Sequence, residues 1–334
     1  MINESVLWIL ISLVAGFAVS SLLGKLLIPA LRALKAGQSI REVGPKWHNG
    51  KAGTPTMGGL MFIAASLLCV ITGWREIKNG EYAHLLVLAL AIAYGLIGFI
   101  DDFVKVKKKR NLGLTSLQKL VLQIIAAAAF LYVLYRTGSL TCDLYIPFVK
   151  EPIVGIPPVI YLIFAVFVIV GCVNAVNLTD GIDGLATGVT MPVMLFFVLI
   201  SMVAGRMGLA TFPAALLGGL GGFLLYNFYP AKVFMGDTGS LFLGGAVCGM
   251  AFALDMPLIL LLVGLIYIIE TLSDILQVTY FKLTHGKRIF KMAPIHHHFE
   301  MCGWSEKKIW TVFVLVTIVM CVIAWLGVPS QWFA

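Results

Sequence analysis

The chain has 334 residues, of which 60% are hydrophobic and only 12% are charged, and its formal net charge is +8. Soluble domains average about 25% charged residues, so this composition excludes an ordinary soluble protein. Several apolar runs of about 20 residues predict instead an all-α polytopic membrane protein.

Ten transmembrane helices are predicted within a single domain, 1–334, because neither an internal repeat nor a low-complexity linker interrupts the chain. The first apolar run, Val6–Leu27, is long enough to span a bilayer and has no small-residue cleavage site after it. We therefore expect a retained helix there and not a signal peptide. The ten expected spans are residues 5–28, 57–74, 83–101, 117–136, 158–176, 185–204, 209–229, 239–254, 257–281 and 308–328.

Lys and Arg residues are unevenly divided between the two sides of this topology. If the side reached after the first span is called inside, the inside loops carry 19 of the 24 Lys and Arg residues and the outside loops carry five. Because positively charged loops stay in the cytoplasm, this bias predicts a cytoplasmic inside face and two external termini. The net charge then reflects topology, and no nucleic-acid partner is expected.

One outside loop has a pattern of its own. Residues 138–158, GSLTCDLYIPFVKEPIVGIPP, alternate weakly between apolar and polar residues and are bounded by Gly and Pro. This pattern is typical of a short external β-hairpin.

Four polar motifs fall on inside loops. Asp101 and Asp102 end the third span, NAVNLTDGIDGLA (174–186) joins the fifth and sixth spans, and VFMGDTGS (233–240) joins the seventh and eighth. The fourth motif, APIHHHFE (293–300), lies between the ninth and tenth spans. The outside loops carry no comparable glycine-framed aspartates, so we predict one shared site on the cytoplasmic face.

Asp101 and Asp102 are adjacent, and neighbouring residues of a regular helix point about 100° apart. Both carboxylates cannot face one point unless the helix is distorted or ends there, and we expect one of these. The alternative is a pair of solvated helix-end carboxylates neutralised by Lys105 and the lysines at 107–109.

The remaining motifs suit a phosphate ligand. Asp180 and Asp183 are framed by glycines that allow close backbone approach, although Asp-Gly also marks ordinary turns. Asp237 lies between small residues in MGDTGS, where a helix N-terminus can bind an anion. The consecutive imidazoles of His296–His298 point apart, which favours anion contact over tridentate zinc binding.

The set of charged residues predicts the type of metal. Several carboxylates with nearby cations, and no dense Cys/His cluster, favour Mg2+, which binds few carboxylates and completes its shell with water and substrate phosphates. Four lysines are available to hold a diphosphate: Lys46, Lys51, Lys105 and Lys119. The residues alone thus predict phosphoryl-type chemistry at a membrane surface.

With KAGTPTMGG (51–59) and NFYPAKVFMGDTGS (227–240) added, these motifs make the chain resemble the phospho-N-acetylmuramoyl-pentapeptide-transferase family over essentially its whole length. That family belongs to the polyprenyl-phosphate N-acetylhexosamine-1-phosphate transferase superfamily. The aspartate motifs also fit superfamily members that use UDP-N-acetylglucosamine, whereas APIHHHFE and KAGTPTMGG favour the muramoyl-pentapeptide branch.

The resemblance implies a reaction and a setting. Undecaprenyl phosphate would attack the β-phosphate of UDP-MurNAc-pentapeptide, giving lipid I and UMP with Mg2+ as cofactor, in the first membrane step of peptidoglycan synthesis. It also implies a homodimer in the bacterial cytoplasmic (inner) membrane, with a bent ninth helix beside a groove for the membrane lipid. The sequence fits such a groove, because the apolar ninth span carries three polar residues on one helical face: Glu270, Asp274 and Gln277. The alternative is a buried polar cluster that is purely structural and contacts no ligand.

The resemblance also implies residue roles. Asp237 would bind Mg2+, Asp101 would deprotonate the lipid phosphate, Asp102 would be a nucleophile, and His296 would be catalytic. Phe234 would stack on uracil, in a pocket with Lys51, Gly181, Ile182, Asp183 and Asn227. The other expected substrate contacts are Thr56, Lys105, Lys119, Asn174, Asn177, Asp180, Gln277, His297 and His298.

Several alternatives remain from the sequence. A lipid phosphate is largely dianionic near neutral pH, which favours direct attack over an aspartyl-phosphate intermediate. An ion-coupled transporter would place its acids near the bilayer midplane on repeated, broken helices, which this sequence does not show. An intramembrane aspartyl protease using Asp101 and Asp237 would need both aspartates inside the membrane, whereas the topology places them at its edge.

Overall fold

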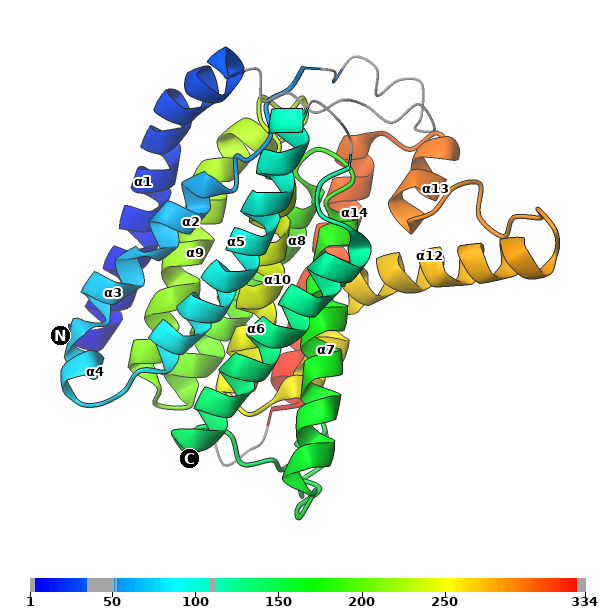
Figure 1. The fold of residues 1–334 in the computed structure, drawn as a ribbon. Helices are drawn as coiled ribbons and strands as arrows, with labels where there is room; N and C mark the ends of the chain where they lie inside the picture. Colours follow the sequence, from blue (N-terminus) through cyan, green and yellow to red (C-terminus); the bar gives the residue numbers. More distant parts are fainter. Residues whose placement is uncertain (1–3, 35–50, 52, 109–111, 329–334) are drawn as a thin grey trace.

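The computed structural model describes residues 4–34, 51, 53–108 and 112–328. Every regular element in these ranges is a helix and none is a strand, which confirms the predicted all-α class (Figure 1). Lys46, expected to hold a diphosphate, lies outside the described residues.

Seven helices in the described ranges are long and apolar enough to cross a membrane, which confirms a multi-pass membrane protein. They correspond to the first, third to seventh and tenth predicted spans. These helices are α1 (Glu4–Ala33), α5 (Ala83–Lys108), α6 (Ser116–Arg136), α7 (Pro158–Thr179), α8 (Leu185–Val203), α9 (Met207–Asn227) and α14 (Glu306–Leu326).

Two predicted spans are broken. The second becomes three short helices, α2 (Leu60–Ser66), α3 (Leu68–Thr72) and α4 (Trp74–Lys78). The ninth comprises η2 (Pro257–Ile259), α11 (Leu260–Val263) and α12 (Leu265–Leu283), with a bend of 81° before α12. Gly264 lies at this bend, where a Cβ would come within 2.6 Å of the Leu260 carbonyl oxygen, so the turn needs a glycine. The structure therefore bears out seven spans, or eight with the bent pair, of the ten predicted.

The eighth predicted span is α10 (Gly236–Ala253), which lies inside the bundle with every residue from Thr238 to Ala253 buried. It packs against α5 and α7. The crossing with α5 is close at Gly98, where a Cβ would lie 2.0 Å from the Asp237 carbonyl oxygen. This contact brings the cationic end of α5 against the first turn of α10.

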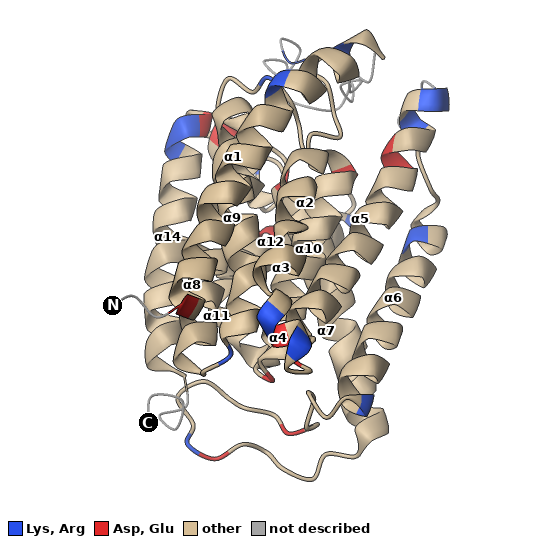
Figure 2. Ribbon diagram, turned by 90° about the vertical axis from the view of Figure 1, so that its left-hand side faces the viewer, with Lys and Arg blue, Asp and Glu red and all other residues tan. Residues whose placement is uncertain are grey.

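Figure 1 shows α12 leaving the bundle sideways, with the short helix α13 (Ile295–Met301) beside it. Figure 2 shows Lys and Arg at the C-terminal ends of α1 and α5 and the N-terminal end of α14, all at one end of the bundle. The cations of α4 and of the C-terminal end of α6 lie at the opposite end. The two groups match the inside and outside loops of the predicted topology.

The predicted hairpin is reduced to a single pair of residues. Leu144 and Ile153 form an isolated antiparallel bridge, with N–H···O distances of 2.9 and 3.0 Å. The pairing does not continue into the loop, where Phe148 has a φ of +69°, outside the extended conformation of a strand, and donates its N–H to the Gly327 carbonyl.

Candidate active site

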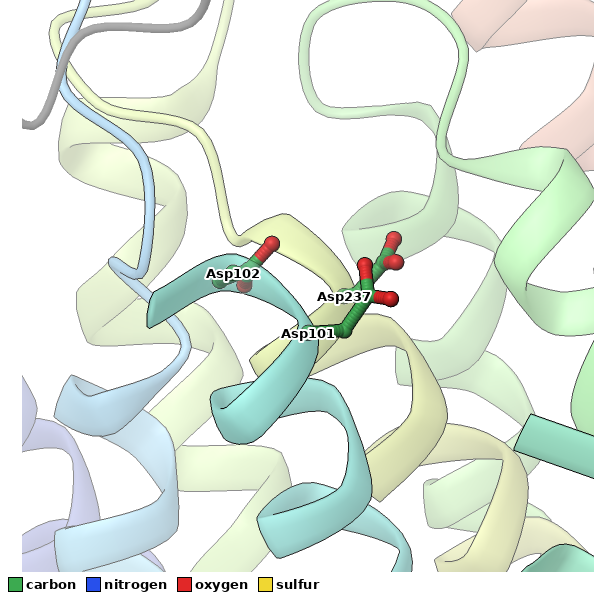
Figure 3. Close-up of side chains that lie close together, drawn as sticks. All are labelled: Asp101, Asp102 and Asp237. Carbon is green, nitrogen blue, oxygen red and sulfur yellow. The ribbon is translucent and has the colours of Figure 1, made fainter. Parts of the chain in front are cut away.

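Three carboxylates meet where α5 crosses the start of α10. One oxygen from each of Asp101, Asp102 and Asp237 lies within 4.8 Å of the others (Figure 3). The two aspartates of α5 are only 2% and 3% exposed, whereas Asp237 is partly exposed. Two of the four sequence motifs therefore converge as expected.

The expectation that the helix ends or distorts at the aspartate pair is wrong, since α5 continues to Lys108. The two carboxylates are instead held by different neighbours. Asp101 Oδ1 accepts the Leu114 N–H at 2.8 Å, from the loop before α6. Asp102 Oδ2 accepts the Thr238 N–H at 2.9 Å and the Thr238 hydroxyl at 2.7 Å. Asp102 thus caps α10 from another helix, which satisfies a backbone donor that α10 cannot pair itself.

Gly236 makes this approach possible. Its φ is +70°, a left-handed conformation that favours glycine. A Cβ here would lie 2.5 Å from Asp102 Oδ2 and 2.6 Å from Thr56 Oγ1. The first glycine of MGDTGS is therefore required by both conformation and space, and Thr56 lies beside the carboxylate pair.

Two lysines and an amide surround Asp237. Lys105 Nζ lies 3.0 Å from Asp237 Oδ2 and 2.6 Å from Asp101 Oδ2. Lys119 Nζ lies 2.7 Å from Asp237 Oδ2 and 3.5 Å from Asp101 Oδ2, and Asn177 donates to Asp237 Oδ1 at 3.0 Å. These predicted residues do come together.

The same group of residues fits a hard cation. Asp101 Oδ2 is buried and lies 2.6 Å from the Lys105 ammonium and 3.5 Å from the Lys119 ammonium. Three carboxylates face two lysines, which leaves one negative charge uncompensated. Carboxylate oxygens are the ligands that Mg2+ prefers.

Asp180 lies just after α7 and differs from the other acids. In the described ranges its carboxylate has neither a hydrogen bond nor an ion pair. Burial, and then the negative charges of Asp237, Asp102 and Asp183, raise the pKa of Asp180 to about 8. Either a proton or a bound cation is therefore needed to neutralise it near pH 7.

Lys51 anchors a second group of contacts. Its Nζ lies 2.7 Å from Asp183 Oδ1 and 2.7 Å from Glu306 Oε2. Burial opposes the lysine's charge, but the hydrogen bonds to these two carboxylates outweigh it and raise the pKa of Lys51. Ala231 donates its N–H to Asp183 Oδ2 at 2.8 Å. Glu306 was not predicted from the sequence, because an acid in the first turn of a helix is common and carries no site signal.

The residues expected to contact uracil are buried or only partly exposed to solvent. Phe234 is partly exposed, and its backbone pairs with Pro55 and Gly58, which joins the two predicted loops. Ile182 is buried. Asn227 is also buried, with its amide bonded to Thr187 and to the Val233 carbonyl.

The three histidine side chains contact different partners, as expected for consecutive imidazoles that point apart. His296 Nδ1 lies 2.9 Å from Glu270 Oε2, and both side chains are fully buried. Its other nitrogen lies against Gly181, where a Cβ would be 2.1 Å away. His297 Nδ1 lies 2.6 Å from Glu300 Oε2, and His298 Nδ1 accepts the Lys291 N–H at 3.1 Å. Of the three, His296 is thus joined to the turn of residues 180–184.

Two other predicted contacts have structural partners. Gln277 accepts the N–H groups of Ile289 and Phe290 and donates to the Phe290 carbonyl, so it fixes that loop. Asn174 donates to Gln123 and to the Val170 carbonyl. Their contact with substrate stays a prediction.

Comparisons with known proteins agree with these motifs. Residues 84–255 match the family model described as glycosyl transferase family 4, and residues 51–63 match phospho-N-acetylmuramoyl-pentapeptide-transferase signature 1. A protein named phospho-N-acetylmuramoyl-pentapeptide-transferase from Clostridium acetobutylicum is 49% identical over 321 residues, covering 96% of this chain and 98% of that relative. One of the same name from Clostridium perfringens (strain 13) is 51% identical over 317 residues, covering 95% and 97% respectively.

Proposed function

The chain belongs to the phospho-N-acetylmuramoyl-pentapeptide-transferase family, and we propose that it transfers phospho-MurNAc-pentapeptide from UDP-MurNAc-pentapeptide to undecaprenyl phosphate. The products would be UMP and undecaprenyl-diphospho-MurNAc-pentapeptide, which is lipid I. Membership of an enzyme family sets aside the transporter interpretation. The observation that supports the reaction best is the convergence of Asp101, Asp102 and Asp237 with two lysines.

Mg2+ is the proposed cofactor, with Asp237 as its first ligand and Asp101 and Asp102 beside it. When bound, it would neutralise charge on the diphosphate and on the departing UMP. The chain's own cations do similar work, because Lys105 and Lys119 lie within 3.0 Å of Asp237 and can reach an anionic substrate there. Reducing the repulsion between two phosphate groups is the main requirement of such a transfer.

Direct attack by the lipid phosphate is the favoured mechanism. Asp102 Oδ2 already accepts two hydrogen bonds from Thr238, and forming an aspartyl phosphate would compete with that helix cap. Asp101 remains the proposed base facing the lipid phosphate, from the family resemblance, and its Oδ2 lies between the Lys105 and Lys119 ammonium groups that would also bind that phosphate.

The setting follows from the family and the charge distribution. We propose ten membrane crossings with both termini external, and an active site that faces the cytoplasm from the bacterial cytoplasmic membrane. A homodimer is proposed from the family resemblance alone.

UMP release tests this proposal. The purified protein is incubated with UDP-MurNAc-pentapeptide, with and without undecaprenyl phosphate and Mg2+, and release is expected only when all are present. UDP-N-acetylglucosamine in place of the donor tests the related hexosamine transferase activity, which we expect to be absent. Labelled UMP should not exchange into the donor when lipid phosphate is omitted, and rapid exchange there would overturn direct attack.

A further inference from the structure

Glu306 lies in the first turn of α14 and is only 8% exposed. Its Oε2 accepts two hydrogen bonds, from Lys51 Nζ at 2.7 Å and from the Asp183 backbone N–H at 3.0 Å. One carboxylate oxygen therefore joins the start of α14 to two segments that are far away in the sequence.

Charge pairing alone does not account for this glutamate. Lys51 already has a partner in Asp183, whose Oδ1 is 2.7 Å from the ammonium. A second buried carboxylate leaves the group with a net negative charge and costs free energy of desolvation. Its geometric effect is different, since it fixes an ammonium and a backbone N–H relative to each other.

The segments held by this carboxylate are those expected to bind a nucleotide. Asp183 belongs to the turn of residues 180–184, which also carries Asp180 and Gly181. Through Asp183 Oδ2 the same group reaches Ala231, in the stretch between α9 and α10. The Tyr229 ring of that stretch lies 5.9 Å from Lys51 Nζ.

We infer that Glu306 is a positioning residue for the nucleotide half of the donor substrate, an inference that rests on the proposed function. It holds the Lys51 ammonium and the turn of residues 180–184 in place before the substrate arrives. An ammonium has three N–H donors, and the two carboxylates use two of them. One donor is left for a carbonyl or phosphate oxygen of the nucleotide.

Steady-state kinetics of Glu306→Ala, with each substrate varied in turn, test the inference. The KM for UDP-MurNAc-pentapeptide should rise about tenfold, because charge-assisted hydrogen bonds are lost. The KM for undecaprenyl phosphate should stay unchanged and kcat should fall much less. Glu306→Gln keeps an acceptor oxygen at the same reach and should lie in between. The matched control is Glu151→Gln, an exposed glutamate in the loop between α6 and α7, which should behave as wild type.

A double variant separates positioning from general loss of stability. If Glu306 acts through the lysine, Glu306→Ala should raise the donor KM much less in a Lys51→Met background than in the wild type. An equal rise in the donor KM in both backgrounds would show that Glu306 does not act through Lys51. Thermal unfolding of each variant in detergent shows whether the protein is folded.

The affinity for UMP, measured by calorimetry, tests the inference without requiring turnover. Wild type and Glu151→Gln should bind UMP equally, and Glu306→Ala about tenfold more weakly. If wild type releases no UMP from UDP-MurNAc-pentapeptide, the proposed function fails, whereas the UMP affinities still test Glu306. Unchanged UMP affinity in a folded Glu306→Ala would overturn the inference. Tighter binding would also overturn it, because Glu306 would then be occupying the place of a ligand oxygen.

Discussion

Replacement of Asp102 by alanine should lower the stability of the protein as well as its activity. The change removes the acceptor of two donors, the Thr238 N–H and its hydroxyl, and Thr238 is almost fully buried. Each buried donor left without an acceptor costs about 1–3 kcal/mol. Loss of the buried carboxylate's own desolvation and of its repulsion with Asp237 offsets part of this cost. We expect a net loss of about 1–3 kcal/mol in the free energy of unfolding.

Asp102→Asn is the matched variant. Its amide oxygen can still accept from Thr238, so the loss should stay below about 1 kcal/mol, typical of a weakened cap. Under direct attack, this variant should also keep measurable turnover. Thermal unfolding in detergent gives the stability, and UMP release gives the turnover. An Asp102→Ala protein as stable as wild type would refute the cap. A folded Asp102→Asn protein without any turnover would refute the view that Asp102 acts mainly as the hydrogen-bond acceptor that caps α10.

Three other outcomes are expected. Asp237→Asn should stay folded by circular dichroism but lose Mg2+-dependent UMP release by about a thousandfold, since metal ligation contributes several kcal/mol; near-normal turnover would contradict the metal assignment. The pKa of Asp180 is raised to about 8, so a cation that also binds this carboxylate must displace its proton at lower pH. Apparent Mg2+ affinity should therefore rise up to about tenfold per pH unit from pH 6 to 8 and then level off. Asp180→Asn should remove this dependence, and an unchanged slope would exclude Asp180 from the metal site. Gly236→Ala should lower the unfolding temperature and turnover, since its positive φ costs a side chain about 1–2 kcal/mol and its Cβ would meet Asp102; wild-type values for both would contradict this account.

Much of the helical layout was predictable because hydropathy reports long apolar segments directly. The bend before α12 was not, since the apolar run is continuous and the turn at Gly264 depends on its contact with the Leu260 carbonyl. The short helices over residues 60–78 were missed for the same reason, as a window of hydropathy does not report a break in helical geometry.

The candidate site was predictable as a set of motifs but less so in its geometry. Asp101, Asp102 and Asp237 meet as expected, yet the helix that carries the pair does not end there. The two adjacent buried carboxylates are held by backbone N–H groups of Leu114 and Thr238. Leu114 lies outside every motif, and although Thr238 belongs to VFMGDTGS, the sequence does not show that its N–H meets Asp102. Glu306 was missed because only the fold shows that it turns inward to Lys51.

The cap on α10 also has a consequence for how the protein is made. Asp102 and Thr238 are separated by 136 residues, so the aspartate enters the membrane well before its partner has been synthesised. Until the eighth span arrives, the buried carboxylates of α5 lack both the α10 backbone and Asp237. A nascent chain that stops short of α10 therefore carries most of the bundle but no assembled site. A ribosome-bound chain truncated before α10 therefore cannot begin turnover, and the residues contributed by α13 and α14 arrive later still.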